Sequence, residues 1–444
     1  MNGGTFTEAG RVRPGVYANV IAQGINKKYD GNKGTVVIPL IGYDYGPKGE
    51  FIEINVESPD ANIEKLGRSV FDERNEYMLR VSMALLNAEK VLIYTVGAGE
   101  KAKVVCDNLT INAKYNGERG NSISVESIVN AEGGFDVKVY LENNVVETYE
   151  AVETVQELIN LNSQNYVVFE EKTAGATISA FTKSKLSGGT STTPANEDIM
   201  TFLDLLEIQS FDWLVMTMTE KEINAAIVEK IRYLNDRIGK LCGVVMVEHA
   251  ADYENVINLT NSFTYGGIDL PIPVAASYVA GAEAKATELE SLTYAIVEGA
   301  TGIVSPKPNE LAEKAIKDGE MFFSMNGENV VIEYDINSLV TFTEEKTKDY
   351  HKNKIIRVHK AFIQSLYETF VPGKFRNTED DWNVMESLGK SLLNDFEERG
   401  AIVNVQDNDF VLDRTRSNGD STYITVGLQA VDATDKYYFN IITR

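Results

Sequence analysis

The sequence predicts a multidomain protein that mixes the α/β and α+β fold classes, and three observations lead to this prediction. The chain has 444 residues, too many for a single compact core. From residue 196 onward strand and helix patterns alternate, as in parallel sheets covered by helices. Between residues 103 and 189 strand patterns occur almost alone, which predicts a small β-sandwich or barrel.

Before this β region the chain reads as the start of an α/β layer. Thr35–Ile41 and Phe51–Val56 have strand patterns, and apolar residues at helical spacing lie within Asp72–Asn87. Val91–Val96 is apolar throughout, as in a strand buried on both faces.

The β region contains four strand patterns separated by Asn- and Gly-rich turns. They are Asn108–Ala113, Ser122–Val129, Phe135–Leu141 and Val145–Tyr149. One helix is expected at Thr154–Asn162, with Thr154 as its N-cap.

In the following α/β region, buried strands are expected at Trp213–Met218 and Gly243–Glu248. Thr219 is expected to cap a helix that runs to about Gly239. Further helices are expected at Tyr253–Leu259, Val274–Leu289 and Leu311–Lys317, and an Asn-Gly hairpin turn at Met325–Glu328.

The last hundred residues begin with a capping box, Thr341-Phe-Thr-Glu344, followed by a long amphipathic helix that Pro372-Gly373 ends. Thr378 is expected to cap a second helix that ends near Gly400. The apolar stripe of the first helix consists of Ile355, Val358, Phe362, Leu366 and Phe370.

Both termini carry strand patterns. Residues 424, 426 and 428 alternate with polar residues, and Tyr437–Ile442 is rich in aromatic and branched residues. At the other end, Arg11–Val20 is extended by pattern, since Pro14 pushes Arg13 out of the helical region. These segments are either edge strands of their own domain or strands that pair with another chain.

Composition narrows the classes of partner. A formal charge of −24 argues against a nucleic-acid groove and against binding to anionic membrane surfaces. Cys106 and Cys242 lie too far apart to suggest a disulfide framework or a zinc site. The first residues have no signal-peptide pattern, and no apolar run reaches the length of a membrane span, so we expect folding in a reducing cytoplasm.

The candidate sites for chemistry are weak. Gly97–Lys101 lacks the spacing of a phosphate loop and is interpreted as a hinge. His249 follows a strand end, with Asp212, Asp252 and Asp269 as candidate partners, but no Gly-x-Ser-x-Gly motif exists. His351 and His359 are expected two turns apart on the long helix, too far for a metal pair. The acidic clusters Glu344–Glu345 and Glu379–Asp381 are expected in first helical turns. We expect no catalytic, metal or cofactor-binding residues.

Several of these segments resemble a known family. Gly3–Phe6, Arg13–Tyr17 and Val431–Tyr437 resemble the tail sheath proteins of contractile bacteriophage tails, most closely those of Gram-positive phages and phage-tail-like bacteriocins. The resemblance extends to Leu109–Asn121 and Leu186–Thr190 and to the order of elements in residues 341–412. Asp380–Trp382 departs from it, because an arginine is expected there in many relatives.

The resemblance implies a core domain built from both ends of the chain, an inserted β domain and a subtilisin-like middle domain without a catalytic triad. It implies that the terminal strands are arms that add to the sheets of neighbouring subunits. The implied parts are an N-terminal arm (1–22), the first part of the core (23–100), the β domain (101–190), the middle domain (191–340), the C-terminal core (341–420) and the C-terminal arm (421–444). The implied interface residues are Val16, Tyr17, Val20, Ile424, Val426, Leu428, Tyr438, Phe439 and Ile441.

The expected function is that of a structural subunit of a contractile sheath, which polymerises helically around a tail tube and drives it through a target envelope. The expected partners are further copies of the chain in stacked rings, the tube protein, and baseplate and terminator proteins, without nucleic acid or membrane insertion. Assembly is expected in the host cytoplasm, followed by a place in a virion tail or a released bacteriocin. The alternatives are a hydrolase-like α/β enzyme and a non-contractile surface-lattice protein.

Overall fold

The structure, a computed structural model, describes residues 3–4, 16–17, 34–97 and 99–443. The chain divides into two compact units, Met1–Asn32 and Lys33–Arg444. In the first unit, β1 (Gly3–Gly4) pairs in parallel with β2 (Val16–Tyr17). Val20, one of the expected interface residues, lies outside the described residues. All elements below belong to the second unit.

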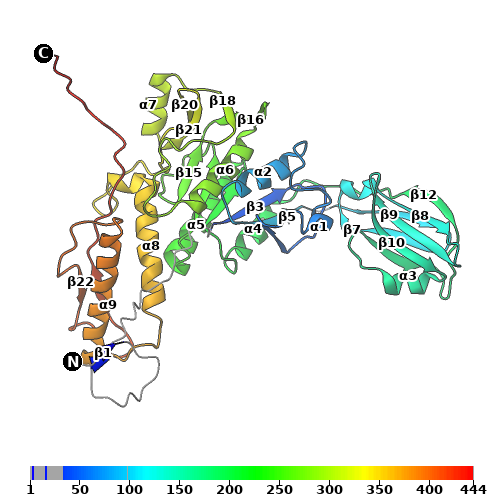
Figure 1. The fold of residues 1–444 in the computed structure, drawn as a ribbon, viewed down its shortest axis with the longest axis horizontal. Coiled ribbons are helices and arrows are strands. Elements are labelled where there is room, and N and C mark those ends of the chain that lie inside the picture. The colour runs from blue at the N-terminus through cyan, green and yellow to red at the C-terminus, as the bar shows by residue number, and fades with distance from the viewer. Residues whose placement is uncertain (1–2, 5–15, 18–33, 98, 444) are drawn as a thin grey trace. The chain divides into compact units, whose positions relative to one another are not determined.

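A seven-stranded sheet is the largest among the described residues, and within it only β4 runs antiparallel to its neighbour (Figure 1). Strand β3 pairs with both β5 and β13, so residues from either side of the β region share one sheet. The order is β19 (Glu320–Met321), β15 (Val256–Leu259), β14 (Gly243–Val247), β13 (Trp213–Met216), β3 (Thr35–Ile41), β5 (Lys90–Val96) and β4 (Phe51–Asn55).

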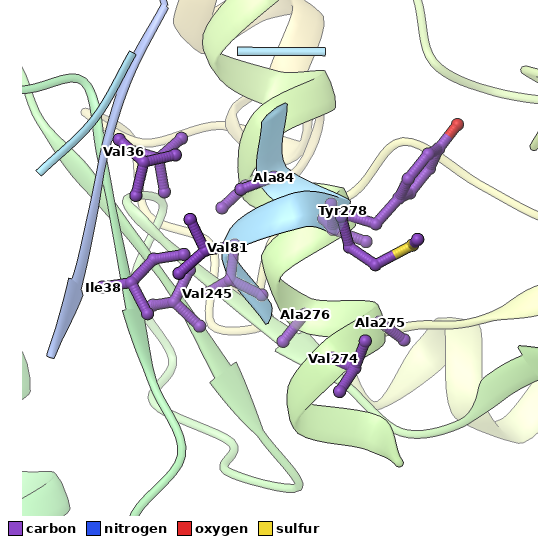
Figure 2. Packing of buried hydrophobic residues seen from close by; sticks show 14 of the residues in the cluster. Val36, Ile38, Val81, Ala84, Val245, Val274, Ala275, Ala276 and Tyr278 are labelled. Atoms are coloured by element: carbon purple, nitrogen blue, oxygen red, sulfur yellow. The ribbon is translucent and has the colours of Figure 1, made fainter. Parts of the chain in front are cut away.

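Helices cover both faces of this sheet, as the alternating pattern predicts. One face packs against α2 (Glu76–Leu85) and α6 (Ile272–Lys285), and the other against α4 (Asn196–Leu205) and α5 (Lys221–Tyr233). Figure 2 shows part of the first cluster, with side chains from β3 and β14 directed toward those of α2 and α6. A Cβ on Gly281 of α6 would lie 2.4 Å from the Ala84 carbonyl oxygen, so only glycine permits this crossing.

One expected helix in this region is wrong. Tyr253–Leu259 contains strand β15, which lies between β14 and β19 with Val256, Ile257 and Leu259 buried. A short apolar run does not distinguish a doubly buried strand from a helix by periodicity alone.

Smaller elements complete the α/β region. The hairpin expected at Met325–Glu328 is confirmed as β20 (Phe323–Asn326) and β21 (Asn329–Ile332). The other elements are α1 (Ile63–Leu66), a π turn (Leu234–Ile238), β16 (Ser262–Tyr265), β17 (Ile268–Asp269), β18 (Ala300–Val304) and α7 (Asn309–Lys317).

The β region is a sandwich of a four-stranded and a three-stranded sheet around its own core. Thr154 caps α3 (Val155–Leu161), and its hydroxyl accepts the Glu157 N–H at 3.1 Å, as predicted. One sheet has the order β10 (Asn144–Val152), β9 (Phe135–Leu141), β8 (Ile123–Val129), β12 (Phe181–Lys185); the other has β11 (Val167–Glu171), β7 (Leu109–Asn116), β6 (Lys101–Cys106), and a 3-10 turn covers Glu118–Ser122.

The C-terminal part contains α8 (Asn353–Thr369), α9 (Glu379–Glu398) and a hairpin of β22 (Phe410–Leu412) and β23 (Ile424–Val426). The capping box at Thr341–Glu344 is wrong, because a 3-10 turn (Lys348–His351) comes first and α8 begins only at Asn353. Glu344–Glu345 therefore lies outside any helix, whereas Glu379–Asp381 occupies the first turn of α9 as expected. Among the described helices, none combines the length and apolar character that crossing a membrane requires.

Candidate functional site

The structure gives His249 a structural environment. Its backbone N–H donates to Asn258 Oδ1 at 2.7 Å, and burial lowers the pKa of its imidazole. The three candidate partners accept hydrogen bonds elsewhere: Asp212 from the Thr35 N–H, Asp252 from the Val340 and Thr341 N–H groups, and Asp269 from the Thr264 hydroxyl. The structure does not bring these residues together as a catalytic group.

The other two histidines lie on different elements, which corrects the expectation that both are on the long helix. His351 ends the 3-10 turn with Nδ1 2.6 Å from the Leu339 carbonyl oxygen, and His359 lies on α8 with its ring 5.0 Å from that of Tyr350. Within the described ranges, no group of three His, Cys, Asp or Glu side chains is placed to hold a metal ion.

The two edges of the β22–β23 hairpin differ. Hydrogen bonds from Gly427 N–H to Asp409 and from Asp413 N–H to Tyr423 (2.7 and 2.8 Å) fix the register, in which Thr425 faces Val411. In an antiparallel ladder the inward-bonded pairs alternate with outward-facing ones. Thr425 therefore bonds within the hairpin, while the N–H groups of residues 424 and 426 point to the outer edge of β23.

The outer edge of β22 is already capped. The Leu412 N–H donates to Glu386 Oε1 of α9 at 3.1 Å, and Arg414 holds that carboxylate at 2.9 Å. No hydrogen bond joins the N–H groups of Ile424, Val426 or Leu428 to another described residue. One edge of the hairpin is thus closed by a side chain, and the other presents N–H groups that no described residue accepts.

The side chains of Ile424, Val426 and Leu428 are half-buried against the core of α8 and α9. They are therefore partly core residues of their own domain. Val426 and Leu428 also line a groove of about 480 Å³ along α8, with apolar walls from Ile356, Phe362, Ile363 and Leu366.

The last described residues of the chain, unlike the half-buried residues of β23, are exposed and form no strand. The strand expected at Tyr437–Ile442 is not formed in the single chain, because a strand requires a hydrogen-bonded partner and this segment has none among the described residues. Tyr438, Phe439 and Ile441, all expected interface residues, are 90%, 81% and 88% exposed. Val16 and Tyr17 form β2, of whose side chains nothing is described.

A buried ionic cluster, which the sequence analysis missed, joins α8 to the α/β region. Arg357 donates to Glu283 of α6 and to Asp335, each at 2.6 Å, and to the Glu290 carbonyl at 2.8 Å. Asn353 Nδ2 lies 3.0 Å from both carboxylates. The only sequence signal is that two polar residues four apart border the apolar stripe of the long helix.

The two carboxyl groups of this cluster are not equivalent. Burial, reinforced by the negative charge of Asp335, raises the pKa of Glu283 well above its usual range. Burial also opposes ionisation of Asp335, but Arg357 outweighs it and lowers its pKa, helped by the Leu292 N–H at 3.0 Å. Of the two carboxyl groups, Glu283 is thus the one whose protonated form this environment favours.

The sequence of the chain matches models of one protein family over most of its length. Three family models match in succession: the phage tail sheath protein beta-sandwich domain at residues 96–196, the phage tail sheath protein central domain at 192–338, and the phage tail sheath C-terminal domain at 345–444. The phage-like element PBSX protein XkdK of Bacillus subtilis is 29% identical over 474 residues, covering 99% of each chain.

Solved structures agree with this match. The sheath tail protein of Desulfitobacterium hafniense has a TM-score of 0.81 at 27% identity, over 95% of this chain and 98% of its own. That of Listeria innocua has a TM-score of 0.75 at 28% identity, over 92% and 94%. The contracted PVC sheath of an extracellular contractile injection system shares the fold, with a TM-score of 0.52 at 10% identity over 98% and 99%. The chain therefore belongs to the phage tail sheath protein family, and its role is that of a structural sheath protein.

Proposed function

We propose that this chain polymerises helically around a tail tube and that contraction of the resulting sheath drives the tube through a target cell envelope. One observation carries the proposal. The same chain has an open strand edge at β23 and, at residues 436–443, an exposed segment with a strand pattern and no hydrogen-bonded partner among the described residues. A strand edge with free donors is a site for addition of an extended segment from another chain.

The energetics of such pairing are sufficient for assembly. Each inter-chain hydrogen bond contributes about 1 kcal/mol net. Burial of each large side chain such as Phe439 or Ile441 contributes about 1.5–3 kcal/mol before ordering costs. Donor segment and acceptor edge are different surfaces, so the contact is heterologous, and such contacts build open helical arrays unless they close into rings.

Contraction would then draw its free energy from new interfaces between subunits. The extended array is a kinetically trapped state, and the arms keep neighbours linked while the domains move. Two neighbours in fold, the AFP and PVC sheaths, were solved in the contracted state. The candidate partners of His249 are engaged elsewhere, Asp212 with Thr35, Asp252 with Val340 and Asp269 with Thr264, which is in keeping with a structural role.

The proposed partners are other copies of the chain, the tube protein, and baseplate and terminator proteins, with assembly in the host cytoplasm before incorporation into a virion tail or bacteriocin. We retain as part of the proposal the six-part division of the chain at residues 22, 100, 190, 340 and 420. The sheet shared by β3 and β13 couples the second and fourth of these parts.

The test compares two proline variants one residue apart. Val426→Pro removes an outward N–H from the β23 edge, whereas Thr425→Pro removes an N–H that bonds within the hairpin. We expect Val426→Pro to abolish tubular polymers, seen by electron microscopy and sedimentation, while the monomer keeps its cooperative melt. Thr425→Pro should lower the melting temperature of the monomer itself.

Deleting residues 436–444 removes the donor instead of the acceptor and should also leave a folded monomer. Normal tubes from both Val426→Pro and the deletion would contradict the proposal. Loss of monomer stability in Val426→Pro, equal to that in Thr425→Pro, would show that this edge belongs to the subunit's own fold.

A further inference from the structure

Among the described residues, the last ion pairs between the C-terminal segment (residues 429–443) and the rest of the fold are made by Lys352. Lys352 Nζ lies 2.5 Å from Asp432 Oδ2 and 2.5 Å from Asp435 Oδ2. The Asp435 side chain is only 9% exposed, so this contact is shielded from water. In Figure 1 the chain leaves the fold beside the start of α8, where Lys352 lies.

Lys352 is itself firmly placed. It is the N-cap residue of α8 and forms a β-bridge with Ile336. On either side, the Asn337 N–H donates to the His351 carbonyl at 3.0 Å and the Asn353 N–H to the Asp335 carbonyl at 3.2 Å. The backbone on the C-terminal side of Lys352 is therefore hydrogen-bonded to Asp335, a member of the buried ionic cluster.

The C-terminal segment is held by backbone bonds only up to Val431. Val403 N–H donates to Gln429, and Val431 N–H donates to Ala401, both at 2.9 Å. After Val431, no described backbone group bonds to another part of the chain. The contact of Lys352 with the two aspartates is the final attachment before the exposed segment 436–443.

We propose that Lys352 is a positioning residue that clamps Asp432 and Asp435 and so fixes the point at which the C-terminal arm leaves its subunit. The inference rests on the proposed function, because it concerns the arm that would pair with a neighbour. The charges support it: burial alone would lower the pKa of Lys352, but the two carboxylates outweigh burial and raise it. The ammonium group therefore stays charged at neutral pH.

The functional consequence is control of strand register. Without the clamp, residues 432–435, whose fully extended length is about 14 Å at about 3.5 Å per residue, are free to take other paths. A slip of a single residue turns every side chain of a strand to the opposite face. A fixed exit point thus determines which of Tyr438 and Phe439 faces the neighbour's core.

The first measurement is made on the monomer. Lys352→Met keeps the aliphatic stem and removes the charge, and Asp432→Asn with Asp435→Asn removes the other side of the clamp. We expect amide hydrogen exchange in residues 430–435 to accelerate at least tenfold in both variants, measured below the assembly concentration. Lys348→Met, an exposed lysine on the preceding turn, is the matched control and should leave exchange unchanged.

The second measurement is the concentration at which tubes form. We expect it to rise at least fivefold in both clamp variants, with tubes of irregular helical order, and to stay unchanged in Lys348→Met. Unchanged exchange in Lys352→Met would overturn the clamp. Faster exchange with normal tubes would overturn its positioning role while leaving the arm pairing intact. If instead both Val426→Pro and the deletion of residues 436–444 assemble normally, the proposed function fails, and the exchange result still decides whether the clamp exists.

Discussion

The inserted sandwich and the C-terminal helices are both attached to the large α/β region, but by opposite means. The sandwich is joined through close backbone contacts, the side chain of Arg119 and the ring contact of Tyr115 with Tyr45. The C-terminal helices are joined through an ionic cluster from which water is excluded. The two joints therefore rest on different interactions: contacts without a buried carboxylate at the sandwich, and buried ion pairs at α8.

The joint of the sandwich is a close backbone approach. The Arg119 N–H donates to the Asp44 carbonyl at 3.1 Å, and its Nε to the Gly67 carbonyl at 2.8 Å. Gly117 has a φ of 125°, and a Cβ there would lie 2.0 Å from the Asp44 carbonyl oxygen. Loss of one such bond leaves no buried carboxylate without its cation, so it should cost less than breaking a buried ion pair.

The joint of the C-terminal helices instead depends on charged side chains that are buried. The side chains of Glu283, Asp335 and Arg357 are 0%, 1% and 9% exposed. A charge left alone in such a site is costly, because neither water nor a second partner replaces the lost one. The stability of this joint therefore depends on every member of the cluster.

The largest effect is expected from Arg357→Met. It leaves two buried carboxyl groups without their cation, and breaking a buried pair in this way costs about 3–5 kcal/mol. Chemical denaturation of the monomer measures the loss. Arg414→Met is the matched control, since Arg414 is 40% exposed and pairs with Glu386 at the surface; its cost should not exceed about 1 kcal/mol. Equal losses in the two variants would remove the distinction between the joints.

A smaller effect is expected from pH through Glu283. Its pKa is raised in the folded state above the ordinary value of 4.5, so folding favours its protonated form. The resulting stability is fully present below pH 4.5 and is lost as the pH rises through the folded pKa. Glu283→Gln mimics the neutral acid and should lack this loss.

The measurement is the free energy of unfolding of both proteins as a function of pH. The difference between wild type and Glu283→Gln should shift by up to about 1.4 kcal/mol per pH unit in favour of the variant, until the folded pKa is passed. Parallel curves for the two proteins would show that Glu283 is ionised in the folded protein.

Periodicity predicted most of the fold because it reports which side chains are buried. The α/β alternation, the sandwich and the two long helices followed from apolar spacing, and Thr154 and the Asn326-Gly327 turn from local chemistry. Failures came where tertiary contacts decide. β15 read as a helix because a strand buried on both faces has no alternation, and α8 starts nine residues after Glu344 because Lys352 pairs with Ile336 instead.

The candidate assembly site was predictable only in part. Alternation identified Ile424, Val426 and Leu428, but not which N–H groups face outward, since that depends on the register with β22. The Glu386 cap, the Arg357 cluster and the Lys352 contact join residues 18 to 83 positions apart, and nothing in the local pattern of either partner signals them.

The smallest effect is expected at the sandwich joint, from Arg119→Ala. Arg119 Nη1 also pairs with Glu142 at 2.6 Å, but the Glu142 side chain is 55% exposed, so the pair is screened by water. We expect the global free energy of unfolding to fall by no more than about 1 kcal/mol. The local consequence should be larger, because the Nε bond to Gly67 joins the sandwich directly to the α/β region. Spin labels on the two domains should therefore give a broader distance distribution by double electron–electron resonance.

Arg119→Lys keeps the charge near Glu142 but loses the forked geometry, so it should broaden the distribution nearly as much. If Arg119→Ala destabilises the protein as much as Arg357→Met, the sandwich is as tightly integrated as the C-terminal helices, and the contrast between the two joints is wrong.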